Sequence, residues 1–184
     1  MAKSGEVRSR RAYFDTRHGQ LHVRTAFPGT GGFDEHTTLF CIHPAGPSQT
    51  SRFFAAFLPL MAADRSLYAP DRPGHGESDG TAASPQAHAE AMADLATDLR
   101  LRKIDLLGVE DGAGVALMLA RAQPDRVRRV VIAAANPQGL GASATQPCLT
   151  LRLGAGGAAE FPLDAFSSDP AGLARAVSAF LNLR

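Results

Sequence analysis

The chain has 184 residues, a length that suits one domain and is too short for two full ones. Apolar residues make up 45% and charged residues 20%, which is enough to build a core and excludes a disordered charged tail. With 19 Lys and Arg against 18 Asp and Glu, the net charge of +1 predicts neither nucleic acid nor an anionic membrane as a partner.

Several sequence features bear on location. The longest uncharged apolar stretch, 53–63, is short and contains Pro59, so no membrane span is predicted. Residues 1–11 are basic and no apolar segment follows them, which predicts a flexible N-terminal arm rather than a signal peptide. Cys41 and Cys148 form neither a disulfide framework nor a zinc pattern, which favours a cytoplasmic protein without a metal.

The first half of the chain alternates strand and helix signals. Residues 12–27 predict a hairpin around a glycine turn. A continuous apolar run over 38–42 predicts a strand buried on both faces, and 66–69 predicts the next strand. Between these strands, 51–62 carries apolar side chains at helical spacing.

The second half continues this alternation. Ser84 before Pro85 is a helix-start signal, and the apolar spacing behind it predicts a helix to about Arg100. Short connections between strands and helices predict a single α/β domain over 12–184, with a mostly parallel twisted sheet of about seven strands and helices on both faces. The further strands are expected at 104–107, 127–135 and 149–153, and the further helices at 112–122 and after Asp169.

The chemistry is expected where predicted strands end. In an open parallel sheet, small-molecule ligands bind beyond the carboxyl ends of the strands. Three segments follow such ends, and they are 43–48, 71–78 and 108–112. We therefore expect a small-molecule ligand at this edge of the sheet.

These segments carry a family resemblance. Residues 71–78 read Asp-Arg-Pro-Gly-His-Gly-Glu-Ser, which resembles the Asp-Arg-x-Gly-x-Gly-x-Ser turn of α/β-hydrolase-fold proteins. Residues 104–131 resemble the strand, nucleophile elbow, helix and following strand of that family, and the opening hairpin resembles the start of many bacterial members. The resemblance covers about residues 12–136. It implies the strand order 1-2-4-3-5-6, which sets the three segments side by side.

The chain departs from the family at the elbow. In the pattern Gly-x-nucleophile-x-Gly, both glycines are present as Gly108 and Gly112, but the nucleophile position is Glu110. After the seventh predicted strand no carboxylate comes before Glu160, and the last histidine is His88. The resemblance therefore implies that acyl transfer by a Ser-His-Asp triad is not available, and that the family's cap domain is absent.

The backbone donors expected for an oxyanion are half retained. In the family, one N–H comes from the loop after the third strand and one from the residue after the nucleophile. Ala45 and Asp111 occupy these positions, while Pro44 cannot donate. The structural alternative for Asp111 is an anion that stabilises the first turn of a helix.

Four further side chains are weighed as pocket or catalytic residues. His43 and His75 are candidates to orient or protonate a ligand beside Glu110, although the family's histidine at the position of His43 is usually architectural. Asp71 shares a glycine-containing turn with His75, which favours a structural role for both. Ser48 is a pocket candidate without an obvious partner histidine.

A cofactor is not expected. The glycine-rich stretch 154–159 formally matches a dinucleotide fingerprint, but it lies late in the chain and Pro162 interrupts the helix that should follow it.

Two functions stay open. The first is an enzyme in which Glu110 acts as nucleophile or general acid/base, hydrolysing an ester, lactone or epoxide, or catalysing an isomerisation or cyclisation. The alternative is a catalytically inactive pseudo-hydrolase that binds or scaffolds, with Glu110 only capping a helix. Loss of an eighth strand would then leave an exposed sheet edge that a second copy could cover in a homodimer. Residues 137–184 either complete the sheet or begin a cap.

Overall fold

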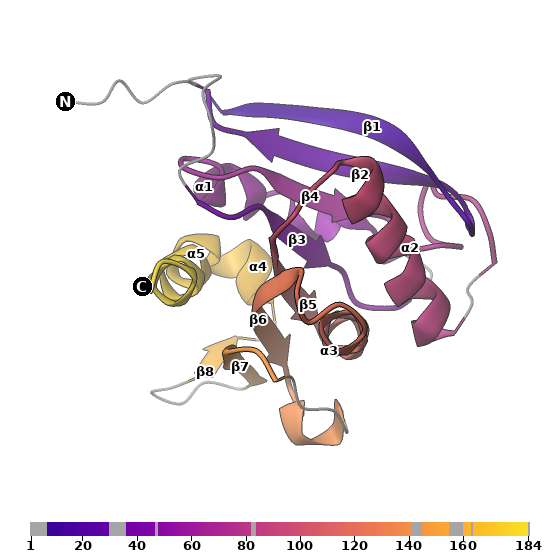
Figure 1. The fold of residues 1–184 in the computed structure, drawn as a ribbon. Coiled ribbons are helices and arrows are strands. Elements are labelled where there is room, and N and C mark those ends of the chain that lie inside the picture. The colour runs from indigo at the N-terminus through magenta and orange to yellow at the C-terminus, as the bar shows by residue number, and fades with distance from the viewer. Residues whose placement is uncertain are drawn as a thin grey trace.

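The computed structural model describes residues 7–29, 36–46, 48–81, 84–140, 145–154, 160–162 and 164–183. They contain an eight-stranded sheet in the order β1-β2-β4-β3-β5-β6-β7-β8 (Figure 1). The order implied by the family resemblance is confirmed, and one strand more is present than the seven expected. The strands are β1 (Arg8–Thr16), β2 (Gly19–Phe27), β3 (Leu39–Ile42), β4 (Leu67–Pro70), β5 (Ile104–Val109), β6 (Val127–Ala134), β7 (Cys148–Gly154) and β8 (Glu160–Pro162).

The sheet is antiparallel at one side only. β1 pairs antiparallel with β2, and β2 pairs antiparallel with β4. Each of the other neighbouring pairs is parallel. The carboxyl ends of β3, β4, β5 and β6 therefore meet at one edge, where the sequence predicts the site.

The hairpin starts earlier than the sequence indicates. Residues 8–11 are assigned to the flexible arm from their basic character, whereas they form the first part of β1. The reason is pairing, because Arg8 lies opposite Phe27 and Arg11 opposite Arg24 in an unbroken register with β2. Their side chains are exposed, and the exposed Arg11 adds an ion pair with Glu77 at 3.2 Å. An edge strand accepts charged residues that a central strand would exclude.

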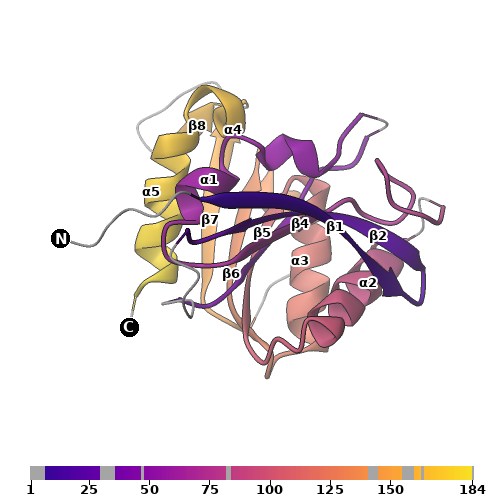
Figure 2. The same cartoon turned by 90° about the horizontal axis from the view of Figure 1, so that it is seen from above.

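Helices cover both faces of the sheet, as predicted. In Figures 1 and 2, α1 (Leu58–Met61), α4 (Ala165–Ser168) and α5 (Pro170–Leu181) lie on one face, and α2 (Pro85–Asp98) and α3 (Asp111–Ala122) lie on the other. Each face has its own cluster of buried apolar side chains. The Ser84 hydroxyl caps α2 by accepting the N–H of Ala87, which confirms the predicted helix start.

The predicted helix over 51–62 is broken in two. A 3-10 turn spans Ser51–Phe54, and α1 begins only at Leu58, with Pro59 in its first turn. A proline ring cannot continue a preceding helix, because it lacks the N–H and clashes with the turn before it. The apolar spacing still serves the core, since the rings of Phe54 and Phe57 are fully buried and each lies 5.4 Å from the ring of Phe166.

The C-terminal segment completes the sheet. β7 pairs parallel with β6. Helix α5 packs its buried side chains on one face of the sheet, in the apolar cluster that includes residues of β7; these side chains are Leu173, Val177 and Leu181. Only residues 135–147 separate β6 from β7, which is too few for a cap domain. The described strands and helix of this segment therefore belong to the sheet and its cover, which favours the first of the two interpretations of 137–184.

A buried ion pair fastens α5 at the far end of the sheet. Arg128 of β6 donates to both carboxylate oxygens of Asp105, at 2.9 and 2.5 Å, and also to the Leu181 carbonyl at 2.7 Å. Arg129 donates to the same carbonyl at 2.7 Å. Burial raises the pKa of Asp105, and the neighbouring arginines oppose that shift. Two strands and the end of a helix are thus tied to one carboxylate.

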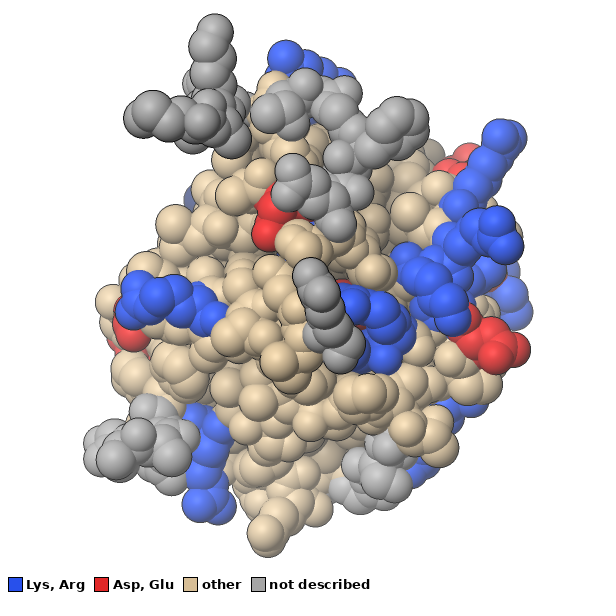
Figure 3. Space-filling view, turned by 60° about the vertical axis from the view of Figure 1, so that its left-hand side comes forward, with Lys and Arg blue, Asp and Glu red and all other residues tan. Residues whose placement is uncertain are grey.

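The face of the molecule shown in Figure 3 is largely uncharged. On this face, Lys and Arg gather toward the right-hand side with Asp and Glu beside them. In the part of the chain that the structure describes, no helix has the length and apolar character needed to cross a membrane.

Leu173→Ala tests whether the C-terminal helix belongs to the core. Leu173 is fully buried, so its truncation should lower the free energy of unfolding by about 2–5 kcal/mol. Leu183→Ala is the matched control, because that side chain is 58% exposed and its loss should change stability by less than about 0.5 kcal/mol. Urea unfolding measures both, and equal effects would contradict the packing of α5.

Candidate active site

The elbow between β5 and α3 is present as the sequence predicts. β5 ends at Val109, α3 begins at Asp111, and Glu110 between them has φ 51° and ψ −122°. This left-handed conformation is strained for a residue with a Cβ. The turn is held by the Glu110 N–H, which donates to the Ala133 carbonyl of β6 at 2.8 Å.

Two glycines make the elbow possible. A Cβ on Gly108 would lie 2.5 Å from Cα of Ala113, in the first turn of α3. A Cβ on Gly112 would lie 2.6 Å from the carbonyl oxygens of both Ile42 and His43. Helix α3 therefore touches the backbones of β5 and β3 at distances that no side chain would permit.

The Glu110 carboxylate lies across the carboxyl ends of β5 and β6. Its Oε1 accepts the N–H of Ala135, just beyond β6, at 3.0 Å. The side chain is partly exposed, and it makes no capping hydrogen bond to α3. The Glu110 side chain therefore does not provide the helix cap that the structural alternative requires. Among the described residues, no hydrogen bond to its other oxygen, Oε2, is present.

The Ala45 N–H, a predicted oxyanion donor, is already engaged by a side chain of the protein. The Ala45 N–H donates to Oδ1 of Asp111 at 2.5 Å. Oδ2 of the same carboxylate accepts from Nη1 of Arg72 at 2.9 Å. Asp111 thus bridges the loop after β3 and the turn after β4, because both present donors to the start of α3.

The contacts of His43 favour an architectural role over proton exchange with a ligand. The ring is fully buried. Its Nδ1 lies 2.7 Å from the Pro44 carbonyl, which only accepts, so Nδ1 carries the proton. Its Nε2 accepts the Arg72 N–H at 3.0 Å. Burial lowers the pKa of His43 to about 4, so the ring is neutral and architectural at pH 7.

His75 also serves the turn rather than Glu110. Its Nδ1 lies 3.1 Å from the Pro73 carbonyl, two residues away. The ring packs between His43 and His88, at centroid distances of 5.4 and 5.7 Å. The structural interpretation of His75 is therefore better supported than the catalytic one.

Asp71 is the buried anchor of this turn, and not a pocket residue. Its carboxylate accepts the Ser51 N–H at 2.5 Å, the Glu77 N–H at 3.0 Å and a proton of His22 Nδ1 at 2.9 Å. Burial by itself would raise the pKa of Asp71, but the two backbone donors and His22 hold it below its usual range. The structural alternative is the correct one here.

Ser48 lies in an exposed turn. No hydrogen bond joins Ser48 to a histidine among the described residues, and its role as a pocket residue stays a prediction.

Arg72 is the residue that the sequence analysis missed. It stands in the family turn without an assigned role, yet it is 1% exposed and pairs with Asp111. A signal was available, since a charged residue directly after a buried strand rarely lacks a partner.

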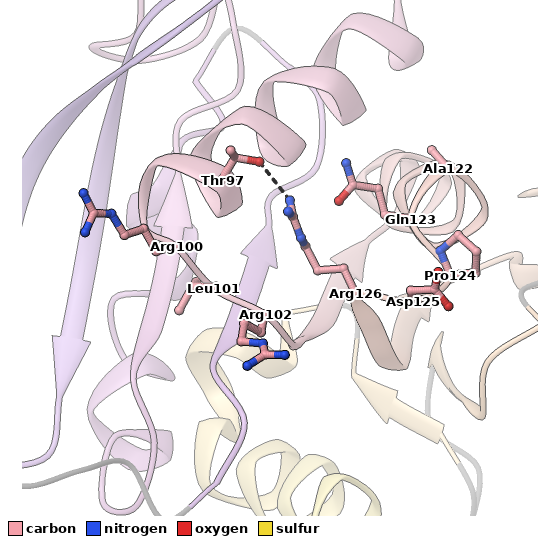
Figure 4. Close-up of a pocket in the computed structure, with 9 residues that line it drawn as sticks. All are labelled: Thr97, Arg100, Leu101, Arg102, Ala122, Gln123, Pro124, Asp125 and Arg126. Atoms are coloured by element: carbon pink, nitrogen blue, oxygen red, sulfur yellow. Dashed lines mark hydrogen bonds between the residues drawn. The ribbon is translucent and has the colours of Figure 1, made fainter.

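A groove lies at the opposite end of the sheet from Glu110. This groove of about 600 Å³ lies where α2 and α3 end and where β5 and β6 begin (Figure 4). Arg126 crosses it to donate to the Thr97 hydroxyl at 3.0 Å. Because Glu110 follows the other end of β5, the groove is separate from the elbow. Its lining residues are Thr97, Arg100, Leu101, Arg102, Ala122, Gln123, Pro124, Asp125 and Arg126.

The sequence predicts neither a metal site nor a nucleotide site. Across the described ranges, no group of three or more His, Cys, Asp or Glu side chains is arranged to hold a metal ion. Of the glycine-rich stretch 154–159, residues 155–159 lie outside the described residues.

Gly112→Ala tests the close approach of α3 to β3. The added methyl group meets two backbone oxygens that cannot move aside, so the variant should lose about 1–3 kcal/mol of stability or fail to fold. Gly114→Ala in the same helix is the control. Its Cβ has no atom within 4 Å, so it should gain about 0.5–1 kcal/mol from helix propensity. A lower unfolding temperature for Gly114→Ala than for Gly112→Ala would contradict this geometry.

Asp71→Asn tests the anchor of the turn through pH. The lowered pKa of Asp71 means that its stabilisation is present above its ordinary value of 3.8 and is lost as pH falls through the native value. The variant should therefore be about 2–3 kcal/mol less stable at pH 7, with the difference shrinking below pH 3.8. Urea unfolding from pH 2.5 to pH 7 measures it, and a pH-independent difference would contradict the assignment.

Comparison with known proteins agrees with this geometry. The model of the alpha/beta hydrolase family matches residues 39–183. The 2-hydroxymuconate semialdehyde hydrolase of Pseudomonas sp. (strain CF600) is 35% identical over 99 residues, covering 51% of this chain and 35% of that protein. The 2-hydroxy-6-oxo-6-phenylhexa-2,4-dienoate hydrolase of Burkholderia cepacia is 31% identical over 114 residues, covering 59% and 39%.

Solved structures share the fold. The naproxen esterase of Bacillus subtilis superposes with a TM-score of 0.59 at 23% identity, over 71% of this chain and 45% of that one. The chain spans less than half the length of each of these three proteins. The sheet order, the strained elbow and the family match together show that the chain belongs to the alpha/beta hydrolase family.

Proposed function

We propose that this protein hydrolyses a small ester, lactone or epoxide with the Glu110 carboxylate in place of a serine hydroxyl. The observation that carries the proposal is the position of Glu110. It stands at the apex of the strained elbow, partly exposed, with one carboxylate oxygen held by Ala135. Backbone strain that persists in a folded protein is typical of functional residues. The chain's membership of the alpha/beta hydrolase family, in which its relatives are hydrolases, adds support.

General-base chemistry suits this carboxylate best. Glu110 takes a proton from water while the water oxygen attacks the carbonyl carbon or the ring carbon of an epoxide. The carbon–oxygen bond of the leaving group then breaks, and the proton passes from Glu110 to the leaving oxygen. The carboxylate is regenerated without help from a histidine, which matters because both ring nitrogens of His43 are engaged.

Stabilisation of a carbonyl oxyanion depends on Asp111. Its backbone N–H lies in the first turn of α3, where the helix dipole favours negative charge. The second donor, the Ala45 N–H, is held by the Asp111 carboxylate. An ester or lactone therefore needs that side chain to move, whereas opening an epoxide at a saturated carbon forms no carbonyl oxyanion.

The second candidate is a pseudo-hydrolase that binds a small molecule without turnover. The engaged Ala45 N–H is the observation that favours it, since the donor expected to act on the substrate serves the fold instead. A homodimer and a cytoplasmic location stay proposals. The eighth strand, whose loss would argue for a dimer, is present as β8, so the dimer proposal rests on β1 at the other edge of the sheet. Free thiols at Cys41 and Cys148 support the cytoplasmic location.

Glu110→Gln separates the two functions. The amide cannot accept a proton in place of the carboxylate, so turnover on a panel of esters, lactones and epoxides should fall at least about 100-fold with unchanged unfolding. Glu90→Gln on α2 is the control and should keep full activity. If the panel also contains substrates for isomerisation and cyclisation, it distinguishes these two reactions from hydrolysis.

Two results would contradict this proposal. One is retained turnover in Glu110→Gln, which would remove Glu110 from the mechanism. The other is covalent labelling by a serine-directed fluorophosphonate, which is expected to fail because no serine occupies the elbow. No turnover by the wild-type chain on any member of the panel would favour the pseudo-hydrolase.

A further inference from the structure

The ion pair between Arg72 and Asp111 is asymmetric in exposure. The Arg72 side chain is 1% exposed, whereas the Asp111 side chain is 50% exposed. Asp111 begins α3, and half of its side chain already faces water. Arg72 follows β4 beneath the loops and has no such access to water. The anion of this pair is therefore replaceable, and the cation is fixed.

Arg72 also has unused donors. Its Nη1 binds Asp111, but Nε and Nη2 are buried without a hydrogen-bond partner among the described residues. The nearby Asp71 carboxylate is occupied by Ser51, Glu77 and His22. A buried guanidinium that lost Asp111 would thus be left without a compensating charge, and such a loss is strongly destabilising.

The groups around this pair define what could replace Asp111. The donors are the Ala45 N–H and the Arg72 guanidinium, which now hold the two oxygens of one carboxylate. The neighbouring His43 and His75 rings bind backbone carbonyls and bring no donor directed at Asp111. Glu110, one residue away, is an anion that disfavours a doubly charged group. A single negative charge shared over two oxygens matches this set of donors.

We propose that Ala45 and Arg72 form a receptor for the carboxylate of a small organic acid, which the chain's own Asp111 occupies when no ligand is bound. The ligand carboxylate takes both donors as the Asp111 side chain turns outward, so the buried cation stays neutralised throughout. The rest of the ligand then lies beside Glu110. The inference rests on the proposed function only for this last placement, and it makes the ligand or substrate a carboxylic acid derivative.

Asp111→Ala tests the receptor with acetate as the probe. The variant should be less stable than the wild type, and sodium acetate should restore its unfolding temperature in a saturable way that sodium chloride at equal ionic strength does not. The wild type should bind acetate at least about tenfold more weakly, because acetate must first displace Asp111. Asp98→Ala, which removes an exposed carboxylate at the end of α2, is the control and should show no acetate effect.

A second measurement, on the wild type, tests the receptor even if Asp111→Ala fails to fold. In the wild type, the amide proton of Ala45 should shift saturably on titration with acetate, followed by nuclear magnetic resonance, and should not shift with chloride. Equal effects of acetate and chloride in either experiment would overturn the proposal. Acetate binding by Asp111→Ala should survive an added Glu110→Gln, so the receptor can stand even where hydrolysis fails, and loss of binding there would overturn it.

Discussion

The site depends on how closely α3 approaches the sheet. The missing side chains of Gly108 and Gly112 let the helix touch the backbones of β5 and β3, and the chain can make that contact only by turning sharply at Glu110. The left-handed backbone of Glu110 is therefore imposed by packing on both sides of it. The same contact brings the start of α3 against the loop after β3, where Asp111 meets Ala45.

Much of the fold follows from local sequence signals. Continuous apolar runs mark the central strands, and the capping residues Ser84 and Asp169 mark the starts of α2 and α5. The misjudged elements are those whose structure is set by neighbours. The start of β1 is polar and is a strand only through its pairing with β2, and β8 has three residues, which is too few for a periodic signal.

The candidate site is predicted only in part. The edge of the sheet and the apex residue Glu110 follow from topology and from the glycine spacing. The roles of His43, Asp71 and Ala45 do not, because each depends on which loop lies opposite it in space. The bridge from Ala45 through Asp111 to Arg72 joins three segments separated by 27 to 66 residues, and no local pattern encodes such a contact.

The fastening of α5 bears on how the chain matures on the ribosome. Synthesis proceeds from the N-terminus, so α5 emerges after every strand of the sheet. Until it does, Arg128 and Arg129 lack their shared acceptor at Leu181, and one face of the nascent sheet lacks part of its apolar cover. α5 therefore completes the apolar cover of this face only after the strands of the sheet have been synthesised.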